Sequence, residues 1–376
     1  MTTVRTPARL ALALATAIVA GCGTKPPPPD PASPPEVAHH RGDRFQNRYV
    51  EFATNDTASY WRWKLDQALR GLPPPPASPV PAVAADRAFI DANAMAGAAM
   101  QPSVTWIGHA TTPVQMGGIN LLTDPIFSER ASPLAFAGPR RAQPPGIAIS
   151  ELPRIDVVLV SHNHYDHCDL PSLAALAHQA GGPPRFVVPL GVGALLAGAG
   201  IANVVELDWW QSTVVDGPAG RVEIVMTPVQ HWSGRRLDDR MQTLWGGYAV
   251  FAPDFQLFFS GDAGYSPDFA DVRARFASRQ GPGRGGGFDL ALLPIGAYEP
   301  RWFMKLQHMD PAEALQASLD LGAKATLAIH WGTFALSDEP LDRPPRDLAQ
   351  ARASREAAGD AFFTLPVGGT RRFPPR

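Results

Sequence analysis

The sequence predicts an α/β fold built in layers. From residue 103 onward, short apolar runs of strand character alternate with helix-like segments, which is the pattern of layered α/β domains. The composition agrees, since 45% of the 376 residues are hydrophobic and 18% are charged, as in a globular protein. The 33 basic and 35 acidic residues give a net charge of −2. This balance argues against a nucleic-acid-binding protein, which would carry a basic excess.

The expected elements follow in chain order. A short helix is expected over 58–69 and an Ala-rich helix over 83–99. Strands are expected at 103–107, 119–123, 155–160, 185–188, 222–226, 246–251, 255–260, 288–293 and 325–329. Further helices are expected at 171–180, 191–198, 266–279, 311–321 and 345–357. For the helix over 311–321, Asp310 is the expected cap and Pro311 suits the first turn.

The N-terminus has the features of a secretory signal. Two arginines precede the apolar run 10–20, which is too short to cross a bilayer, since a spanning helix needs about 20 residues. Gly21 and Cys22 follow. This arrangement resembles a bacterial lipoprotein signal, in which residues 1–21 are removed and Cys22 is lipidated. An ordinary signal peptide with a chance cysteine is the alternative.

The segments after the signal predict a tethered domain. Residues 22–35 are rich in proline and predict an extended tether. Residues 36–70 are too aromatic for a linker, so we expect 36–100 to form an arm packed on the main domain, 101–376. We expect the protein in the bacterial cell envelope, anchored by lipid. Because Gly23 rather than an acidic residue follows the cysteine, we place it in the outer membrane, facing the periplasm or the cell surface.

The densest chemical signal is the stretch SHNHYDHCD. It brings His162, His164, Asp166 and His167 together directly after the apolar run 155–160. Imidazole and carboxylate groups are typical metal ligands. Loops at strand ends are also where α/β folds present reactive groups. The stretch therefore predicts a metal site.

Three more residues of ligand type occupy comparable positions. His231, Asp262 and His330 each come just after an apolar run. For any one of them, a satisfied core residue is the alternative interpretation. The whole set of seven exceeds the three or four ligands of one tetrahedral zinc, and it suits two metal ions that share a bridging carboxylate.

These motifs resemble a known family. The stretch around His162 matches the HxHxDH signature of the metallo-β-lactamase superfamily. Within it, the chain resembles the phospholipases D that hydrolyse N-acyl-phosphatidylethanolamine. The resemblance covers about 102–336, with matching stretches at 105–111, 122–133, 258–265, 295–315 and 328–336. It implies the αββα four-layer sandwich of that superfamily.

The resemblance also implies a ligand set. One zinc would be held by His162, His164 and His231. A second would be held by Asp166, His167 and His330. Asp262 would bridge the two, with a hydroxide between them. Iron or manganese in place of zinc stays open, because His/Asp sites bind several metals.

Other positions of the family carry supporting roles. Asp124 occupies the place of a carboxylate that orients a ligand imidazole, although it could be only a turn residue. Gln307 and His308 match substrate-binding positions that line the site. His308 is the candidate for phosphate contact or proton supply, and a helix-start histidine facing solvent is the alternative. Together with His308, the expected catalytic residues are Asp166 and Asp262. Cys168 is interpreted as a buried small residue rather than a ligand.

The implied function is phosphodiester hydrolysis of phospholipase D type. N-acyl-phosphatidylethanolamine, or a related phospholipid, would give phosphatidic acid and an N-acylethanolamine. The expected partners are this phospholipid and a membrane surface. A lactonase or other acyl hydrolase of the same fold is one alternative, and a non-catalytic lipoprotein that binds metal or lipid is another. Residues 209–210 and the arginines 235, 236 and 240 could contact lipid, or could equally be core and solvated loop.

Overall fold

The structure is a computed structural model that describes residues 38–51, 57–236, 238–281, 286–355 and 361–376. The expected signal peptide 1–21, Cys22 and the tether 22–35 lie outside the described residues. Among the residues that are described, no helix combines the length and apolar character needed to cross a bilayer.

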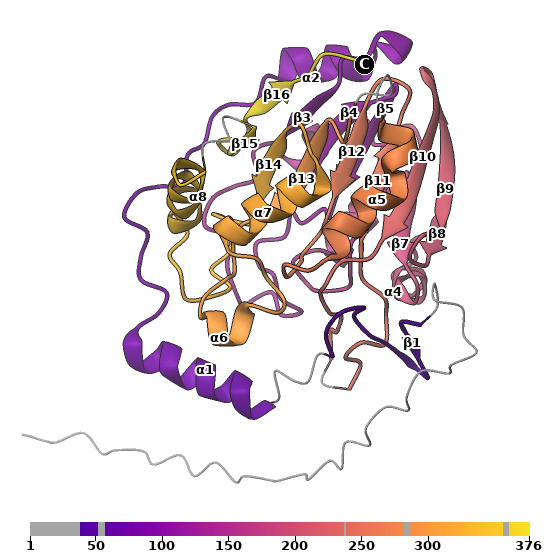
Figure 1. Cartoon of the computed structure of the whole chain (residues 1–376). Coiled ribbons are helices and arrows are strands. Elements are labelled where there is room, and N and C mark those ends of the chain that lie inside the picture. The colour runs from indigo at the N-terminus through magenta and orange to yellow at the C-terminus, as the bar shows by residue number, and fades with distance from the viewer. Residues whose placement is uncertain (1–37, 52–56, 237, 282–285, 356–360) are drawn as a thin grey trace, which may run out of the picture.

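Two seven-stranded sheets form the centre of the described chain (Figure 1). The N-terminal sheet has the order β16 (Thr370–Arg372), β3 (Ser103–Thr105), β4 (Thr112–Met116), β5 (Ile119–Thr123), β6 (Val157–Leu159), β7 (Arg185–Pro189) and β8 (Val204–Leu207). The C-terminal sheet has the order β15 (Phe362–Phe363), β14 (Thr326–Ile329), β13 (Leu290–Pro294), β12 (Gln256–Phe259), β11 (Gly247–Phe251), β10 (Gly220–Thr227) and β9 (Ser212–Gly217). β5 through β8 run parallel, as do β12 through β15.

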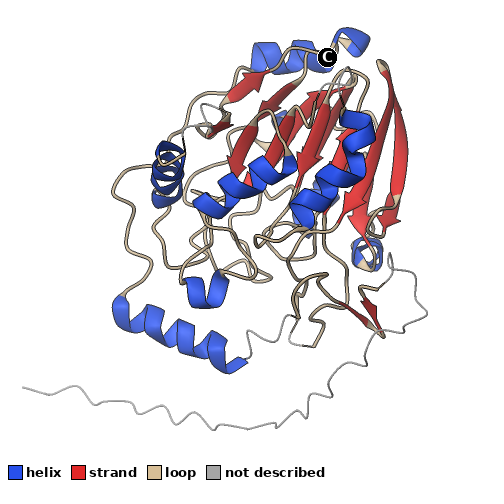
Figure 2. Cartoon of the chain, viewed as in Figure 1, coloured by secondary structure: helices blue, strands red, loops and turns tan. Residues whose placement is uncertain are grey.

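Helices cover the outer faces of the two sheets (Figure 2). α3 (Leu170–Ala177) and α4 (Val192–Gly198) lie on the N-terminal sheet, whereas α5 (Asp268–Gln280) and α7 (Pro311–Leu321) lie on the C-terminal sheet, with α8 (Arg343–Ala353) packed beside α7. α2 (Arg87–Ala94) lies near β3 and β16. The expected four-layer αββα sandwich is therefore confirmed.

Alternation along the strands places each side chain in its layer. In β6, Val157 and Leu159 face the large core between the sheets, and Val158 faces the smaller core under α3 and α4. All three are fully buried. This explains the continuous apolar run that predicts the strand, because a parallel strand covered on both faces has no polar side.

Every strand expected from the sequence is present, but several elements were not expected. β4 and β9 are two of them. The helix expected over 83–99 is shorter than predicted. It is α2, which begins after the cap Asp86, and it is followed by a separate 3₁₀ turn at Gly97–Ala99. Gly97 has φ +58, a left-handed conformation through which an α-helix does not continue toward residue 99.

The segment before the sandwich lies along one side of it. β1 (His40–Arg41) pairs with β2 (Arg44–Phe45), and Phe45 N donates to Met241 O at 2.8 Å. α1 (Thr57–Arg70) contacts α6 (Arg301–Met304), where the rings of Trp63 and Phe303 stack with centroids 4.7 Å apart. In Figure 1, α1 lies below the sandwich near α6.

One tyrosine joins the two sheets. Tyr248 of β11 is fully buried, and its hydroxyl donates to the carbonyls of Val160 and Val187 at 2.9 and 3.2 Å.

We expect Tyr248→Phe to lower the free energy of unfolding by about 1–2 kcal/mol, because both buried carbonyls lose a donor without a cavity being made. Urea denaturation measures this. Tyr60→Phe, at an exposed position, is the control, and equal midpoints for the two variants would contradict the expectation.

Candidate metal centre

The residues of ligand type come from four strand ends at one edge of the sandwich. His162, His164, Asp166 and His167 lie in the loop after β6. The other three follow strands of the opposite sheet: β10 leads to His231, β12 to Asp262 and β14 to His330. Because the carboxyl ends of parallel strands share one edge of a sheet, residues far apart in sequence meet there.

The donor atoms around these strand ends gather in four groups. In each group they lie within 4.8 Å of one another. One group is His162, His164 and His231; the second is His109, Asp166, His167 and His330; the third is Asp262, His308 and His330; the fourth, which links the first to the second, is Asp124, His162 and His167. The structure thus brings together all seven predicted ligands, and it adds His109 and His308 beside them.

Asp262 lies between the groups. Its Oδ2 is 3.1 Å from His167 Nε2 and 3.8 Å from His231 Nε2, and its Oδ1 is 3.1 Å from His330 Nε2. A carboxylate with nitrogens on both sides is positioned to share its oxygens between two ions. This is the geometry that the bridging role requires.

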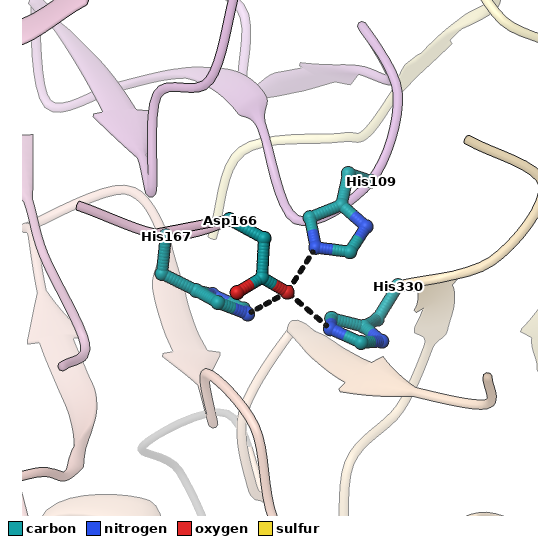
Figure 3. A group of neighbouring side chains, drawn as sticks. All are labelled: His109, Asp166, His167 and His330. Atoms are coloured by element: carbon teal, nitrogen blue, oxygen red, sulfur yellow. Dashed lines mark hydrogen bonds and ion pairs between the residues drawn. The ribbon is translucent and has the colours of Figure 1, made fainter. Parts of the chain in front are cut away.

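Asp166 has a similar position in the second group (Figure 3). Its Oδ2 lies 3.0 Å from His109 Nε2, 3.3 Å from His167 Nε2 and 3.4 Å from His330 Nε2. His109 is not one of the seven predicted ligands. Its Nε2 contacts the same oxygen of Asp166 as His167 and His330 do, and so helps to hold that carboxylate.

Hydrogen bonds behind the ligands fix which ring nitrogen faces the centre. His167 Nδ1 donates to Asp124 Oδ2 at 2.6 Å, and His231 Nδ1 donates to the Gln307 carbonyl at 2.9 Å. His162 Nδ1 lies 2.9 Å from Ser161 Oγ, which itself donates to Asp124 Oδ2. In each case Nδ1 is engaged behind the centre and Nε2 is directed inward, which is the orientation that a metal ligand needs.

The backbone around the centre is held in unusual conformations. His109, Asp124 and His330 have φ values of +53, +31 and +62. Side chains other than glycine rarely adopt such values, and they persist where the surrounding structure enforces them, often at functional sites. Gly261, before Asp262, has φ +61, and a Cβ there would lie 2.3 Å from Ser161 Cβ. Only glycine therefore allows the loops of the two sheets to approach so closely.

Burial and the neighbouring carboxylates together set the charges of the imidazoles. Burial lowers the pKa of His164 and of His231 to about 3, so both rings are neutral and able to bind metal at neutral pH. Burial also acts to lower the pKa of His330, but the charge of Asp262 and the close approach of Asp166 outweigh it and raise that pKa to about 9. The buried carboxylates thus attract positive charge, which a bound cation can supply.

The donor set fits metal ions better than it fits a closed hydrogen-bond network. His167 Nε2, His330 Nε2 and Asp262 Oδ1 are buried and make no hydrogen bond. Buried polar atoms without partners are rare and costly. Neutral imidazoles and carboxylates facing a common centre are the ligands of zinc, iron and manganese.

The two expected substrate-binding residues differ in what they contact. His308 has its Nδ1 3.9 Å from Asp262 Oδ2, and that nitrogen makes no hydrogen bond. Burial lowers its pKa to about 3. The Gln307 side chain instead donates to Phe303 O at 3.2 Å, away from the centre, and the main-chain carbonyl of Gln307 holds His231. Gln307 thus supports a ligand, and His308 faces the centre.

Asn47 is a supporting residue that the sequence did not single out. Its Nδ2 donates to His231 O at 2.8 Å, and its Oδ1 accepts from His231 N at 3.0 Å. The signal that could have identified it is the weak likeness of RFQN, 44–47, to the N-terminal arm of the resembled family. A single asparagine has no chemical signature of its own.

Neighbouring residues with reactive or charged side chains are engaged elsewhere. Cys168 packs in the smaller core, where burial raises the pKa of its thiol to about 12. Arg235 donates to the carbonyls of Asn163 and Cys168, both at 2.8 Å. Trp209 is buried, with its Nε1 donating to Trp245 O. These contacts are internal to the protein.

Asp124 provides a test of how the ligands are held. Asp124→Asn keeps the volume but removes the charge that fixes His167, so we expect metal affinity to fall by about 10–100-fold. Metal retained after dialysis against graded chelator measures this. Asp254→Asn, at a turn where the carboxylate accepts from Gly117 N, is the control. Equal retention in both variants would contradict the role given to Asp124.

Comparison with known proteins places this geometry in a family. The model of the beta-lactamase superfamily domain matches residues 119–331. The chain is similar to an uncharacterized protein of Mycobacterium tuberculosis, with 39% identity over 304 residues, covering 80% of this chain and 74% of that protein. It is also similar to an N-acyl-phosphatidylethanolamine-hydrolyzing phospholipase D of Caenorhabditis elegans, with 37% identity over 272 residues, covering 70% of this chain and 74% of that enzyme.

A solved structure agrees on the fold. A metallo hydrolase from the archaeon Ignicoccus hospitalis superposes with a TM-score of 0.53 at 20% identity, covering 73% of this chain and 98% of that one. The family match includes more than half of the chain, and the sandwich and the inward-facing donors agree with it. The chain belongs to the beta-lactamase superfamily and is a metal-dependent hydrolase of that family.

Proposed function

We propose that this hydrolase is a zinc phosphodiesterase of phospholipase D type. It cleaves N-acyl-phosphatidylethanolamine, or a related phospholipid, into phosphatidic acid and an N-acylethanolamine. The observation that carries the proposal is the set of seven donors at one edge of the sandwich, in a chain with 37% identity to a relative named for this reaction. Seven donors suit two ions, and two ions suit displacement at a phosphodiester.

The donor groups suggest how two ions would be held. His162, His164 and His231 would hold one; Asp166, His167 and His330 the other; Asp262 lies between them. When bound, a pair of such ions supplies a hydroxide nucleophile at neutral pH and neutralises the charge that grows on the phosphoryl oxygens. Zinc is the metal we propose, because imidazole-rich sets with carboxylate favour it.

The protein's own groups would keep the centre rigid. Asp124 and the Gln307 carbonyl fix two ligand rings through Nδ1, and His109 fixes Asp166. Held in this way, the donors do not have to reorganise as charge develops, which is the main source of electrostatic catalysis. Because the low pKa of His308 leaves it neutral, we assign its ring to contact with a phosphate oxygen rather than to donation of a proton as imidazolium.

A cavity beside the metal-binding loop suits a lipid substrate. Its volume is about 670 Å³, and its lining includes Tyr165 of that loop together with Leu134 and Leu195. Three arginines and three acidic residues complete its charged lining. The apolar side chains suit the acyl chains of a phospholipid. Anchoring in the outer membrane through Cys22 would keep such a cavity near its substrate, and we retain it as part of this proposal.

Product analysis tests the reaction. The zinc-loaded full chain is incubated with mixed micelles of N-acyl-phosphatidylethanolamine, phosphatidylcholine and phosphatidylethanolamine, and products are identified by mass spectrometry. We expect phosphatidic acid and N-acylethanolamine, and their release should stop when a chelator removes the metal. Asp262→Asn should lower turnover by more than about 100-fold, because the shared carboxylate is lost.

The other outcomes of this experiment are informative. Release of free choline or ethanolamine would replace the N-acyl selectivity with a broad phospholipase D. Turnover of a lactone by the same metallated preparation, with no phospholipid product, would refute the phosphodiesterase and favour an acyl hydrolase.

His308 has a separate test. We expect His308→Ala to reduce kcat for the phospholipid by about 100–1,000-fold, since a preorganised contact to the phosphoryl oxygens is removed. His308→Gln should recover part of that loss, because an amide can still donate a hydrogen bond. Zinc content, measured in parallel, should stay unchanged. His178→Ala, at an exposed helix end, is the control, and a kcat for His308→Ala equal to that of the control would exclude the contact.

A further inference from the structure

A second group of donor side chains lies apart from the metal centre. It consists of His39, His40 and Asp208, and it shares no residue with the groups around Asp262. His39 Nε2 lies 2.7 Å from Asp208 Oδ1, and His40 Nε2 lies 2.8 Å from Asp208 Oδ2. Two imidazoles from the N-terminal arm therefore converge on the two oxygens of one carboxylate at the end of β8.

The group is held in place before any ligand arrives. The Asp208 side chain is 10% exposed and that of His39 only 3%. Trp209 N donates to Asp208 Oδ1 at 2.7 Å, and Asp208 N donates to Gln211 Oε1 at 3.0 Å. The ring of His39 stacks on Trp209, with centroids 4.2 Å apart and planes 24° apart. Ligands fixed by neighbours in this way bind a metal without having to be ordered first.

Access from solvent is open on one side. The His40 side chain is 40% exposed, and His39 lines a cavity of about 440 Å³ that also touches Asn47, Trp209 and Arg275. The exposed side of His40 gives an ion its route to the group and leaves room for a water molecule as a fourth ligand. Two histidines, a carboxylate and a water make a tetrahedral set that zinc accepts.

The distances of 2.7 and 2.8 Å within this group are shorter than the spacing of ligands around a bound ion, and the metal centre shows the same shortening. Ligands about 2.0 Å from a tetrahedral ion lie roughly 3.3 Å from each other. In the metal centre, His162 Nε2 and His164 Nδ1 are 2.7 Å apart, so predicted ligands of one ion there are drawn together to the same extent as His39 and Asp208. Small side-chain movements would admit an ion at either place.

We propose that His39, His40 and Asp208 bind one divalent transition metal ion, which holds the N-terminal arm at the end of β8. The ligand types favour zinc. The proposal does not rest on the reaction proposed above, because the site shares no ligand with the metal centre. The role of the ion is structural, because it fixes the start of the described arm and so limits the motion of the arm residues after it.

The proposed ion influences the metal centre through the arm. Seven residues after His40 comes Asn47, whose side chain holds the main chain of His231 from both sides. Between them, Phe45 N donates to Met241 O at 2.8 Å and Arg44 Nη1 donates to Arg240 O at 2.6 Å, so the arm lies along the loop that follows His231. Loss of the ion should loosen the arm and, with it, this one ligand of the metal centre.

Zinc content is the first test. The full chain, dialysed against zinc buffered at a fixed free concentration, should contain about one zinc ion more per chain than His40→Gln or Asp208→Asn. Asp208→Asn is the sharper variant, because the amide keeps the shape and an acceptor oxygen for Trp209 N but loses the charge. Arg48→Gln is the matched control. It removes an arm contact, to Asp268 and Asp271, without touching the group, and it should keep the additional ion.

Hydrogen exchange of the arm is the second test. With zinc at the same buffered concentration, amides in 38–48 should exchange at least about 10-fold faster in Asp208→Asn than in the wild type, and removing zinc should abolish the difference. Equal zinc content in wild type and both variants would overturn the proposal. So would arm exchange in the wild type that zinc does not change, since the arm would then be held by hydrogen bonds alone. If His40→Gln does not fold, the exchange of the wild type with and without zinc still decides the question.

Discussion

The structure depends on the burial of three carboxylates at the edge where the two sheets meet. Asp124 and Asp262 are buried among imidazoles and Asp166 is mostly buried among them, and an uncompensated charge in such a place would cost several kcal/mol. Cations and hydrogen bonds must therefore offset it. Strands from both sheets are needed to deliver the donors, because no single loop holds enough of them. The two sheets together thus position the donors that offset these charges.

The rest of the molecule is built to keep the two sheets in a fixed relation. Tyr248 bridges them through its hydroxyl, and Gly261 allows the loops of the two sheets to touch. The left-handed His330 donates its N–H to the His109 carbonyl at 3.0 Å, which joins the last ligand loop to the first turn of the sandwich. A shift of one sheet against the other would disturb ligands on both sides at once.

The sequence predicts the parts of this design that have a chemical or periodic signature. The apolar runs give the buried strands, and the dense donors at 162–167 identify the loop after β6. β4 is not predicted because Pro113 and Gln115 interrupt its apolar pattern. β9 is not predicted because it is a half-buried edge strand. The Gln307 contact is made by a carbonyl, which every residue has, so side-chain identity cannot reveal it. Asn47 and His231 are 184 residues apart, and only the folded chain brings them together.

The ends of the family match and the ends of the physical unit do not coincide. Residues 119–331 contain all seven ligands, yet β3 and β4 come before them, and β15 and β16 come after them as the outermost strands of the two sheets. Asn47 lies still further away, in the arm. A gene fragment trimmed to the match would encode every ligand but leave each sheet with an unpaired inner strand, a common cause of aggregation. For library building and domain shuffling, the exchangeable cassette is therefore the whole span from the arm to β16.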